Sequence, residues 1–214
     1  MYIAVEGVIG VGKTTLARML QSRFEAELQL EVFEENPFLA DFYSDRERYA
    51  FQTQIFFLLS RYHQQRRSVR EVLDSGRSLL TDYTFAKDAL FASINLNGDE
   101  LEMYYKVHEA LGEKVRLPDL IVYLQADTQV LMQRIAMRDR SYERNMEVGY
   151  IELLNQAYND HFVHHYQGPP VLTIQTDHLD FVKNTSDLDL IQAQVQQELS
   201  TLLKQDSLPI NNGR

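Results

Sequence analysis

The fold is decided by the stretch Gly7-Val8-Ile9-Gly10-Val11-Gly12-Lys13-Thr14, which matches the pattern G-x-x-x-x-G-K-[ST] at every fixed position. A short apolar run, Tyr2 to Val5, comes before it, and the segment Lys13 to Glu27 that follows carries apolar residues four apart, as on one helix face. The stretch therefore stands between a predicted strand and a predicted helix. Its glycines let consecutive N–H groups turn inward, so the sequence predicts a phosphate-binding loop.

The side chains of the loop point to a nucleotide triphosphate with a metal ion, and we expect ATP and Mg²⁺. Lys13 is expected to reach the β and γ phosphates, and the hydroxyl of Thr14 is a hard oxygen ligand for Mg²⁺. Asp82 follows the apolar run Ser78 to Thr81 and is a second metal ligand in this interpretation, because carboxylates at the C-terminal edge of a parallel sheet face the ligand. The predicted nucleotide-binding residues are Gly7, Val8, Ile9, Gly10, Val11, Gly12, Lys13, Thr14, Thr15 and, from a later segment, Arg138.

Composition narrows the class of protein further. The chain has 214 residues, a formal net charge of −10 and no cysteine. An acidic chain repels a nucleic-acid backbone, so we expect no polymer partner, while the lack of cysteine excludes disulfides and thiolate metal sites. We see neither a signal peptide nor an apolar run long enough to cross a membrane, and we therefore expect a cytoplasmic protein.

Short apolar runs alternate with amphipathic segments along the chain, which predicts a three-layer α/β fold around a five-stranded parallel sheet. We expect one domain over residues 1–204 and a loose tail over 205–214. Strands are predicted at 2–5, 30–33, 78–81, 120–124 and 171–174. Helices are predicted at 13–27, 46–73, 87–94, 100–111, 129–137 with Thr128 as its N-cap, 150–165 and 188–203.

Two acidic residues follow the second predicted strand. Glu34 would end that strand at the ligand edge, where a carboxylate can take the proton of an attacking hydroxyl. Glu35 is the rival, because adjacent strand residues point to opposite faces.

Arginines gather between the fourth and fifth predicted strands. Arg134 and Arg138 are four apart and share a helix face, and Arg140 follows them. Planar guanidinium groups suit the dispersed charge of a transferring phosphoryl group, so we interpret residues 138–147 as a basic lid that closes over the nucleotide.

Taken together, these segments resemble the deoxynucleoside kinase family, in particular its bacterial deoxyadenosine/deoxyguanosine kinase branch. The resemblance extends from the first strand to about Val182. It rests on GVIGVGKT, FEENPFLADFY, YAFQTQIFFLLSR, LLTDYTFAKDALFAS, PDLIVYLQAD and RIAMRDRSYE. It implies a P-loop kinase fold with an arginine-rich lid, transfer of phosphate from ATP to the 5′-hydroxyl of a deoxynucleoside, and a homodimer.

The resemblance also implies roles for individual residues. Glu34 corresponds to the general base, and Gln52 to the residue that reads the nucleobase through its amide donor and acceptor. The 3′-hydroxyl would be held by Tyr43 and Glu143. The other implied residues are the catalytic lid arginines Arg134, Arg138 and Arg140 beside Lys13, and the substrate-binding Asp82, Lys87 and Asp88.

One departure and two alternatives remain open. Many family members carry an acidic-Arg-Ser triplet after the third strand, whereas this chain reads Asp82-Tyr83-Thr84 and lacks the arginine. Either Lys87 or a lid arginine supplies that positive charge, or the transition state is stabilised less strongly here. The first alternative is a nucleoside-monophosphate kinase resembling thymidylate kinase, although Glu34 and Glu35 would repel an acceptor phosphate. The second is a nucleotide-dependent switch, although the guanine-reading motif Asn-Lys-x-Asp is absent from the sequence.

Overall fold

Five parallel strands form one sheet in the order β2-β3-β1-β4-β5 in the computed structural model, which describes residues 1–206 apart from the side chains of residues 34, 205 and 206. The central strand β1 pairs with β3 on one side and β4 on the other, so that Ile3 lies opposite both Leu80 and Leu120. The strands are β1 (Tyr2–Gly7), β2 (Ala26–Gln29), β3 (Ser78–Thr81), β4 (Leu120–Gln125) and β5 (Val171–Gln175). This confirms the predicted five-stranded α/β fold.

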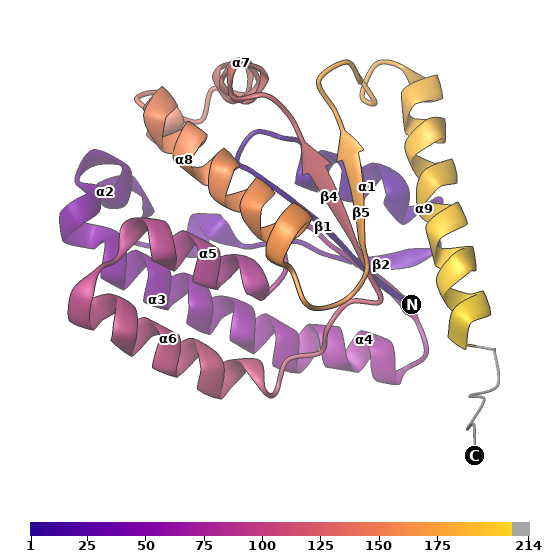
Figure 1. The fold of residues 1–214 in the computed structure, drawn as a ribbon, viewed down its shortest axis with the longest axis horizontal. Coiled ribbons are helices and arrows are strands. Elements are labelled where there is room, and N and C mark those ends of the chain that lie inside the picture. Colours follow the sequence, from indigo (N-terminus) through magenta and orange to yellow (C-terminus); the bar gives the residue numbers. More distant parts are fainter. Residues whose placement is uncertain (207–214) are drawn as a thin grey trace.

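Helices cover both faces of the sheet (Figure 1). On one face lie α1 and α9, which are joined where Arg23, just after α1, donates to Asp189 at 2.5 Å. The other face is covered by α3, α4, α5 and α8, with α6 outside α3 and α5. The bounds are α1 (Lys13–Gln21), α2 (Leu39–Ser44), α3 (Arg46–Gln64), α4 (Arg70–Asp74), α5 (Ala86–Asn95), α6 (Gly98–Gly112), α7 (Thr128–Arg138), α8 (Val148–Asn159) and α9 (Thr185–Asp206).

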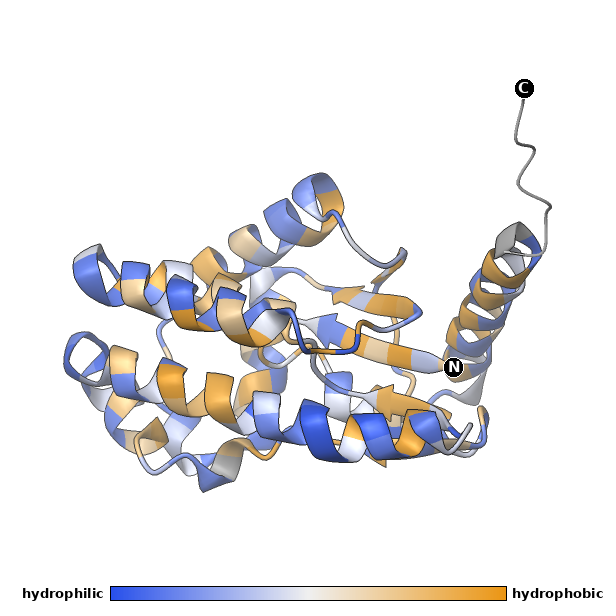
Figure 2. Ribbon diagram, turned by 90° about the horizontal axis from the view of Figure 1, so that it is seen from below, coloured by the Kyte–Doolittle hydropathy of each residue, from blue (hydrophilic) through white to orange (hydrophobic). Residues whose placement is uncertain are grey.

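The core lies between the sheet and these two helical layers. Every residue of β1 is buried, as are the first five residues of β4. Figure 2 shows hydrophobic colours along much of the sheet, whereas the helices alternate between hydrophilic and hydrophobic residues. Strands buried on both faces are typical of parallel sheets, which explains why these segments appear in the sequence as continuous apolar runs.

The second strand differs from its prediction: it spans Ala26–Gln29 and not 30–33. Helix α1 ends at Gln21, and Glu25 adopts a left-handed backbone with φ of 48°, which turns the chain into β2 directly. The strand stops at Gln29 because its partner β3 ends at the paired residue, Thr81. Glu34 therefore does not end a strand, and lies in a 3₁₀ turn over Phe33–Glu35.

The remaining differences are local. Thr128 is the first residue of α7, and Asp127 occupies the N-cap position without a capping bond from its side chain. A π-helical turn, Gln65–Val69, joins α3 to α4 inside the predicted helix 46–73. Helix α9 continues to Asp206, and residues 207–214 of the predicted tail lie outside the described part of the chain. Within residues 1–206, we find no helix whose length and hydropathy would suit a membrane span.

Candidate functional site

The phosphate-binding loop connects β1 to α1 in the predicted way. Gly10 and Gly12 have φ of 89° and 107°, in the left-handed region that glycine tolerates without strain. At Gly10 a Cβ atom would also lie 2.7 Å from Ile135 and 2.9 Å from the carbonyl oxygen of Leu131. Glycine is therefore required there for its backbone conformation and for the close approach of α7.

Lys13 opens α1 and extends over this loop. Its ammonium donates to the carbonyl oxygens of Gly7 at 2.6 Å and Val8 at 3.1 Å. Burial lowers the pKa of Lys13 to about 8, with a further contribution from the nearby charge of Lys87. The amine is thus held against the loop, where an anionic ligand would favour its protonated form and raise its pKa.

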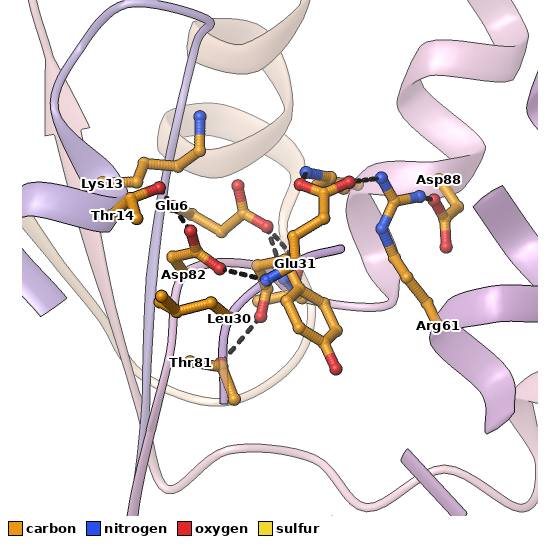
Figure 3. Close-up of polar contacts among 12 residues, drawn as sticks. Glu6, Lys13, Thr14, Leu30, Glu31, Arg61, Thr81, Asp82 and Asp88 are labelled. Carbon is orange, nitrogen blue, oxygen red and sulfur yellow. Dashed lines mark hydrogen bonds and ion pairs between the residues drawn. The ribbon is translucent and has the colours of Figure 1, made fainter. Parts of the chain in front are cut away.

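Thr14 and Asp82 form the second part of the loop's site (Figure 3). The Thr14 hydroxyl contacts one carboxylate oxygen of Asp82, and the other oxygen accepts from the backbone N–H of Glu31 at 2.7 Å. A hydroxyl and a carboxylate beside a phosphate loop are oxygen donors that suit a Mg²⁺ ion, which keeps several waters and needs few protein ligands. These two residues are therefore the ones that could hold such an ion.

A buried carboxylate connects the loop to the segment that follows β3. Glu6 accepts from the backbone N–H of Gly7 at 3.1 Å and from both the backbone N–H and the hydroxyl of Thr84, at 2.5 and 2.9 Å. The hydroxyl of Tyr158 donates to the same side chain at 3.4 Å. Because a buried charge needs several donors to be stable, these bonds fix the two ligand-facing segments relative to each other.

Glu31 lies between two cations next to Asp82 (Figure 3). One carboxylate oxygen pairs with Arg61, and the other accepts from the ammonium of Lys87 at 2.5 Å. Burial alone would raise the pKa of Glu31, but the charges of Arg61 and Lys87 outweigh it and lower the pKa to about 2. Arg61 pairs in turn with Asp88, so these four side chains form one ionic network.

One cavity joins this network to the phosphate loop. Gln54, Phe57 and Arg61 line it from α3, at positions three and four residues apart that share a helix face. Although the chain as a whole is acidic, more cations than carboxylates line this cavity. The cations are Lys13, Arg61, Lys87, Arg138 and Arg140, and the carboxylates are Glu31, Asp82 and Glu143.

The lid begins where α7 ends, at Arg138. Asp139 has a left-handed backbone with φ of 50°, so the chain turns back across the cavity there. Glu143 is buried, and its carboxylate accepts from Arg138 at 2.6 Å and lies 3.6 Å from Arg140. Both arginines are thus tied to Glu143 and line the cavity.

The lid also touches the opposite wall, α2. The rings of Tyr43 and Tyr142 are stacked with centroids 6.0 Å apart. Arg46, at the start of α3, pairs with Glu147 and places its guanidinium 4.5 Å from the ring centre of Tyr150. Burial and the neighbouring Tyr150 and Glu143 raise the pKa of Tyr43 well above its usual range, so its hydroxyl stays protonated.

Most of the residues predicted from the sequence line the cavity. They are Ile9, Gly10, Gly12, Lys13, Thr14, Thr15, Tyr43, Asp82, Lys87, Arg138, Arg140 and Glu143. Gly7, Val8 and Val11 belong to the loop without lining it, and Asp88 lies behind Arg61.

Three predicted residues are placed differently. Gln52 is exposed on α3 and does not line the cavity. Arg134 donates to the carbonyl oxygen of Val11 at 3.3 Å and to the hydroxyl and carbonyl of Thr176 at 2.9 and 2.6 Å, outside the cavity lining. The side chain of Glu34 lies outside the described residues.

Glu31, Gln54 and Arg61 also line the cavity, and the sequence did not predict them as site residues. The spacing of Gln54, Phe57 and Arg61 is a signal for the last two, since it places a polar pair on one face of a helix. For Glu31 the sequence holds no comparable pattern, because its partners Arg61 and Lys87 lie 30 and 56 residues away.

Comparisons with known proteins agree with this geometry. The family model described as deoxynucleoside kinase matches residues 3–200. The chain is 36% identical to a deoxyguanosine kinase of Bacillus subtilis over 92% of this chain and 96% of the relative, and 28% identical to the deoxyadenosine/deoxycytidine kinase of the same organism over 90% of each. The solved structure of a deoxyadenosine kinase from M. mycoides superposes with a TM-score of 0.79 at 25% identity, over 92% of this chain and 100% of that one.

The match covers nearly the whole chain and includes the loop, the ionic network and the lid. A cavity with a phosphate loop at one end and the rings of Phe57 and Phe91 in its wall is suited to a phosphate donor and a nucleoside acceptor. The chain belongs to the deoxynucleoside kinase family, and its activity is the transfer of a phosphoryl group from a nucleotide to a deoxynucleoside.

Proposed function

We propose that this protein transfers the γ-phosphoryl group of ATP to the 5′-hydroxyl of a deoxynucleoside. The observation that supports this most directly is the position of Glu31, whose backbone N–H is bonded to Asp82 while its carboxylate lines the cavity shared with Lys13. A carboxylate at that point faces both the acceptor hydroxyl and the donor phosphate, which is where the proton must be removed.

Thr14 and Asp82 would hold Mg²⁺ at the donor end, where the ion neutralises phosphate charge. Lys13 and the backbone N–H groups of the loop bind the β and γ phosphates. Arg138 and Arg140 lie on the lid side and stabilise the charge that spreads over the transferring group. Arg134 contributes indirectly, because its bonds to Val11 and Thr176 support the outer side of the loop.

Glu31 replaces Glu34 as our candidate for the general base. The argument for Glu34 assumed that it ends the second strand, and that strand ends at Gln29. With its pKa lowered to about 2, Glu31 is a carboxylate at every physiological pH and accepts a hydrogen bond from the 5′-hydroxyl. A weak base is sufficient, since phosphoryl transfer depends mainly on positioning and charge stabilisation.

Gln54 replaces Gln52 as the candidate that reads the base. Its side chain is buried at the cavity wall, and within residues 1–206 it has no hydrogen-bonding partner, so donor and acceptor remain available for a nucleobase edge. The rings of Phe57 and Phe91 line the same part of the cavity and would contact the faces of the base. Tyr43 and Glu143 also line the cavity, and we expect them to bind the 3′-hydroxyl.

An ADP-release assay tests this function. With Mg²⁺-ATP, we expect turnover on at least one of the four natural deoxynucleosides, and none above background on their monophosphates or without an acceptor. The preferred nucleoside identifies the base that Gln54 accepts.

Other outcomes of this assay would contradict the proposal. Turnover restricted to monophosphates would move the protein to the thymidylate-kinase type of reaction and remove Glu31 as the base. Hydrolysis that is independent of acceptor would favour a nucleotide-dependent switch.

The lowered pKa of Lys13 predicts a pH dependence of nucleotide binding. In the free protein the amine has a pKa of about 8, and bound phosphates favour its charged form. Affinity for Mg²⁺-ADP should therefore be constant below pH 7 and fall as the pH rises through 8, by up to about tenfold per unit. Calorimetry at pH 6.5 to 9.5 measures this, and an affinity that stays within about twofold would contradict it.

A homodimer remains a prediction. The helices α3 and α6 carry exposed apolar side chains at Leu59, Met103 and Tyr105, and a second copy of the chain would cover them.

A further inference from the structure

The position after Asp82 contributes no cation to the cavity. Tyr83 occupies it, its side chain is completely buried, and its hydroxyl has no hydrogen-bonding partner among the described residues. Tyr83 does not line the cavity. Any positive charge near the candidate general base, Glu31, must therefore come from another helix or loop.

Lys87, in the first turn of α5, brings such a charge from the other side. Its side chain is only 5% exposed, its ammonium donates to Glu31 at 2.5 Å, and it lies 5.9 Å from the ring centre of Phe91. A lysine ammonium has three donors on a flexible stem, and within residues 1–206 we find only Glu31 as its hydrogen-bonding partner. Two donors are thus available for another anionic group in the cavity.

The two cations beside Glu31 differ in their freedom. Arg61 is held on both sides, by Glu31 and by Asp88, and its guanidinium stacks 4.8 Å from the ring centre of Phe57. It is fixed at the nucleoside end of the cavity. Lys87 has one anionic partner, so a small rotation of its stem moves the ammonium without breaking a second ion pair.

Lys87 also lies toward the phosphate loop. Its charge is close enough to Lys13 to lower the pKa of that residue, and both amines line the same cavity. Glu31 is connected through Asp82 to Thr14, next to Lys13. The ammonium of Lys87 thus lies beside Glu31, the carboxylate expected to face the acceptor hydroxyl, and it lines the same cavity as Lys13, which is expected to bind the γ phosphate.

We propose that Lys87 is a catalytic residue whose ammonium bridges the carboxylate of Glu31 and a non-bridging oxygen of the phosphoryl group in transfer. This rests on the proposed function. The 5′-oxygen forms the new bond to phosphorus, the bond from phosphorus to the β–γ bridging oxygen breaks, and the hydroxyl proton passes to Glu31. Lys87 remains protonated throughout and stabilises the charge on the transferring oxygens.

Substitution of Lys87 by methionine, an apolar side chain of similar length, tests this. We expect kcat to fall by about 10²–10³-fold, as for the loss of one charge-stabilising donor, with the deoxynucleoside Kd changed by less than about threefold. Lys106→Met is the matched control, because Lys106 is exposed on α6 and pairs with Glu102, away from the cavity. It should retain the full kcat.

A double variant distinguishes direct contact of Lys87 with the phosphoryl group from an effect of Lys87 that acts only by positioning Glu31. In a Glu31→Gln background, adding Lys87→Met should lower kcat by at least about a further tenfold, because the contact with the phosphoryl group is lost independently. A double variant no slower than Glu31→Gln, or a single variant within about threefold of the wild type, would overturn the proposal.

A final variant covers the case in which methionine prevents folding. Lys87→Gln keeps an N–H donor toward Glu31 and removes the charge, so it should fold and still lose at least about thirtyfold in kcat. A glutamine variant with wild-type kcat would overturn the proposal. Failure of the proposed function itself is recognised separately, because the wild-type protein would then show no turnover on any deoxynucleoside.

Discussion

Replacing Glu31 with glutamine will lower kcat by about 10²–10⁴-fold and leave the fold intact. The amide is nearly the same shape as the carboxylate, but only its single oxygen can still accept from Arg61 or Lys87, and it cannot take the proton of the 5′-hydroxyl. Because the pKa of Glu31 is lowered to about 2, the wild-type group is already fully ionised at the assay pH. A glutamine side chain does not ionise, so raising the pH should not restore the activity of the variant.

Glu34→Gln provides the comparison, measured by steady-state kinetics together with circular dichroism of each variant. We expect its kcat to stay within about threefold of the wild type. If Glu34→Gln is the inactive variant and Glu31→Gln is active, the base lies in the 3₁₀ turn over Phe33–Glu35 and our assignment is wrong.

Substitution of Lys13 by methionine will lower kcat/KM by about 10³-fold. The methionine cannot bind the β and γ phosphates, and the loop loses the positive charge that the backbone N–H groups only partly supply. The same variant should bind Mg²⁺-ADP weakly and without the pH dependence expected of the wild type, because no amine with a pKa near 8 remains.

Arg18→Met is the control for this experiment. Arg18 is an exposed cation on the same helix, α1, and does not line the cavity, so the variant has the same change in net charge. We expect its kcat/KM to remain within about twofold of the wild type. Equal losses in both variants would mean that net charge, and not the position of Lys13, controls binding.

Local signals were sufficient for much of this fold. The third strand was predicted with its observed bounds, Ser78–Thr81, because Gly76 and Asp82 interrupt the pattern on either side. The phosphate loop was predicted because its glycines and Lys13 act through backbone geometry that is encoded within a few residues.

The second strand and the base depend on distant parts of the chain. Residues 26–29 read Ala-Glu-Leu-Gln, which looks like a continuation of α1, and they form a strand because β3 pairs with them. Glu31 becomes a site residue through Asp82, Arg61 and Lys87, none of which is near it in sequence. Such contacts follow from the packed fold and have no local pattern.

Residue type alone could not predict which glutamine of α3 faces the cavity. Gln52 and Gln54 are both amides on α3, two positions apart and thus about 200° apart around the helix axis. Only the packing of α3 against the rest of the chain decides which of them reaches the cavity. A helical wheel anchored on Phe57 would have selected Gln54.

The contacts between α2 and the lid have a consequence for how the products depart. Tyr142 of the lid stacks on Tyr43 of α2, and Glu147 of the lid pairs with Arg46 at the start of α3. The lid, expected over the donor, is thus joined to the wall that is expected to face the acceptor. We therefore expect one opening movement to uncover both halves of the cavity, so that the spent donor and the new monophosphate leave by the same route. We expect the residence times of the two products to depend on the same pair of contacts, one of which involves Tyr43, a residue proposed to bind the acceptor.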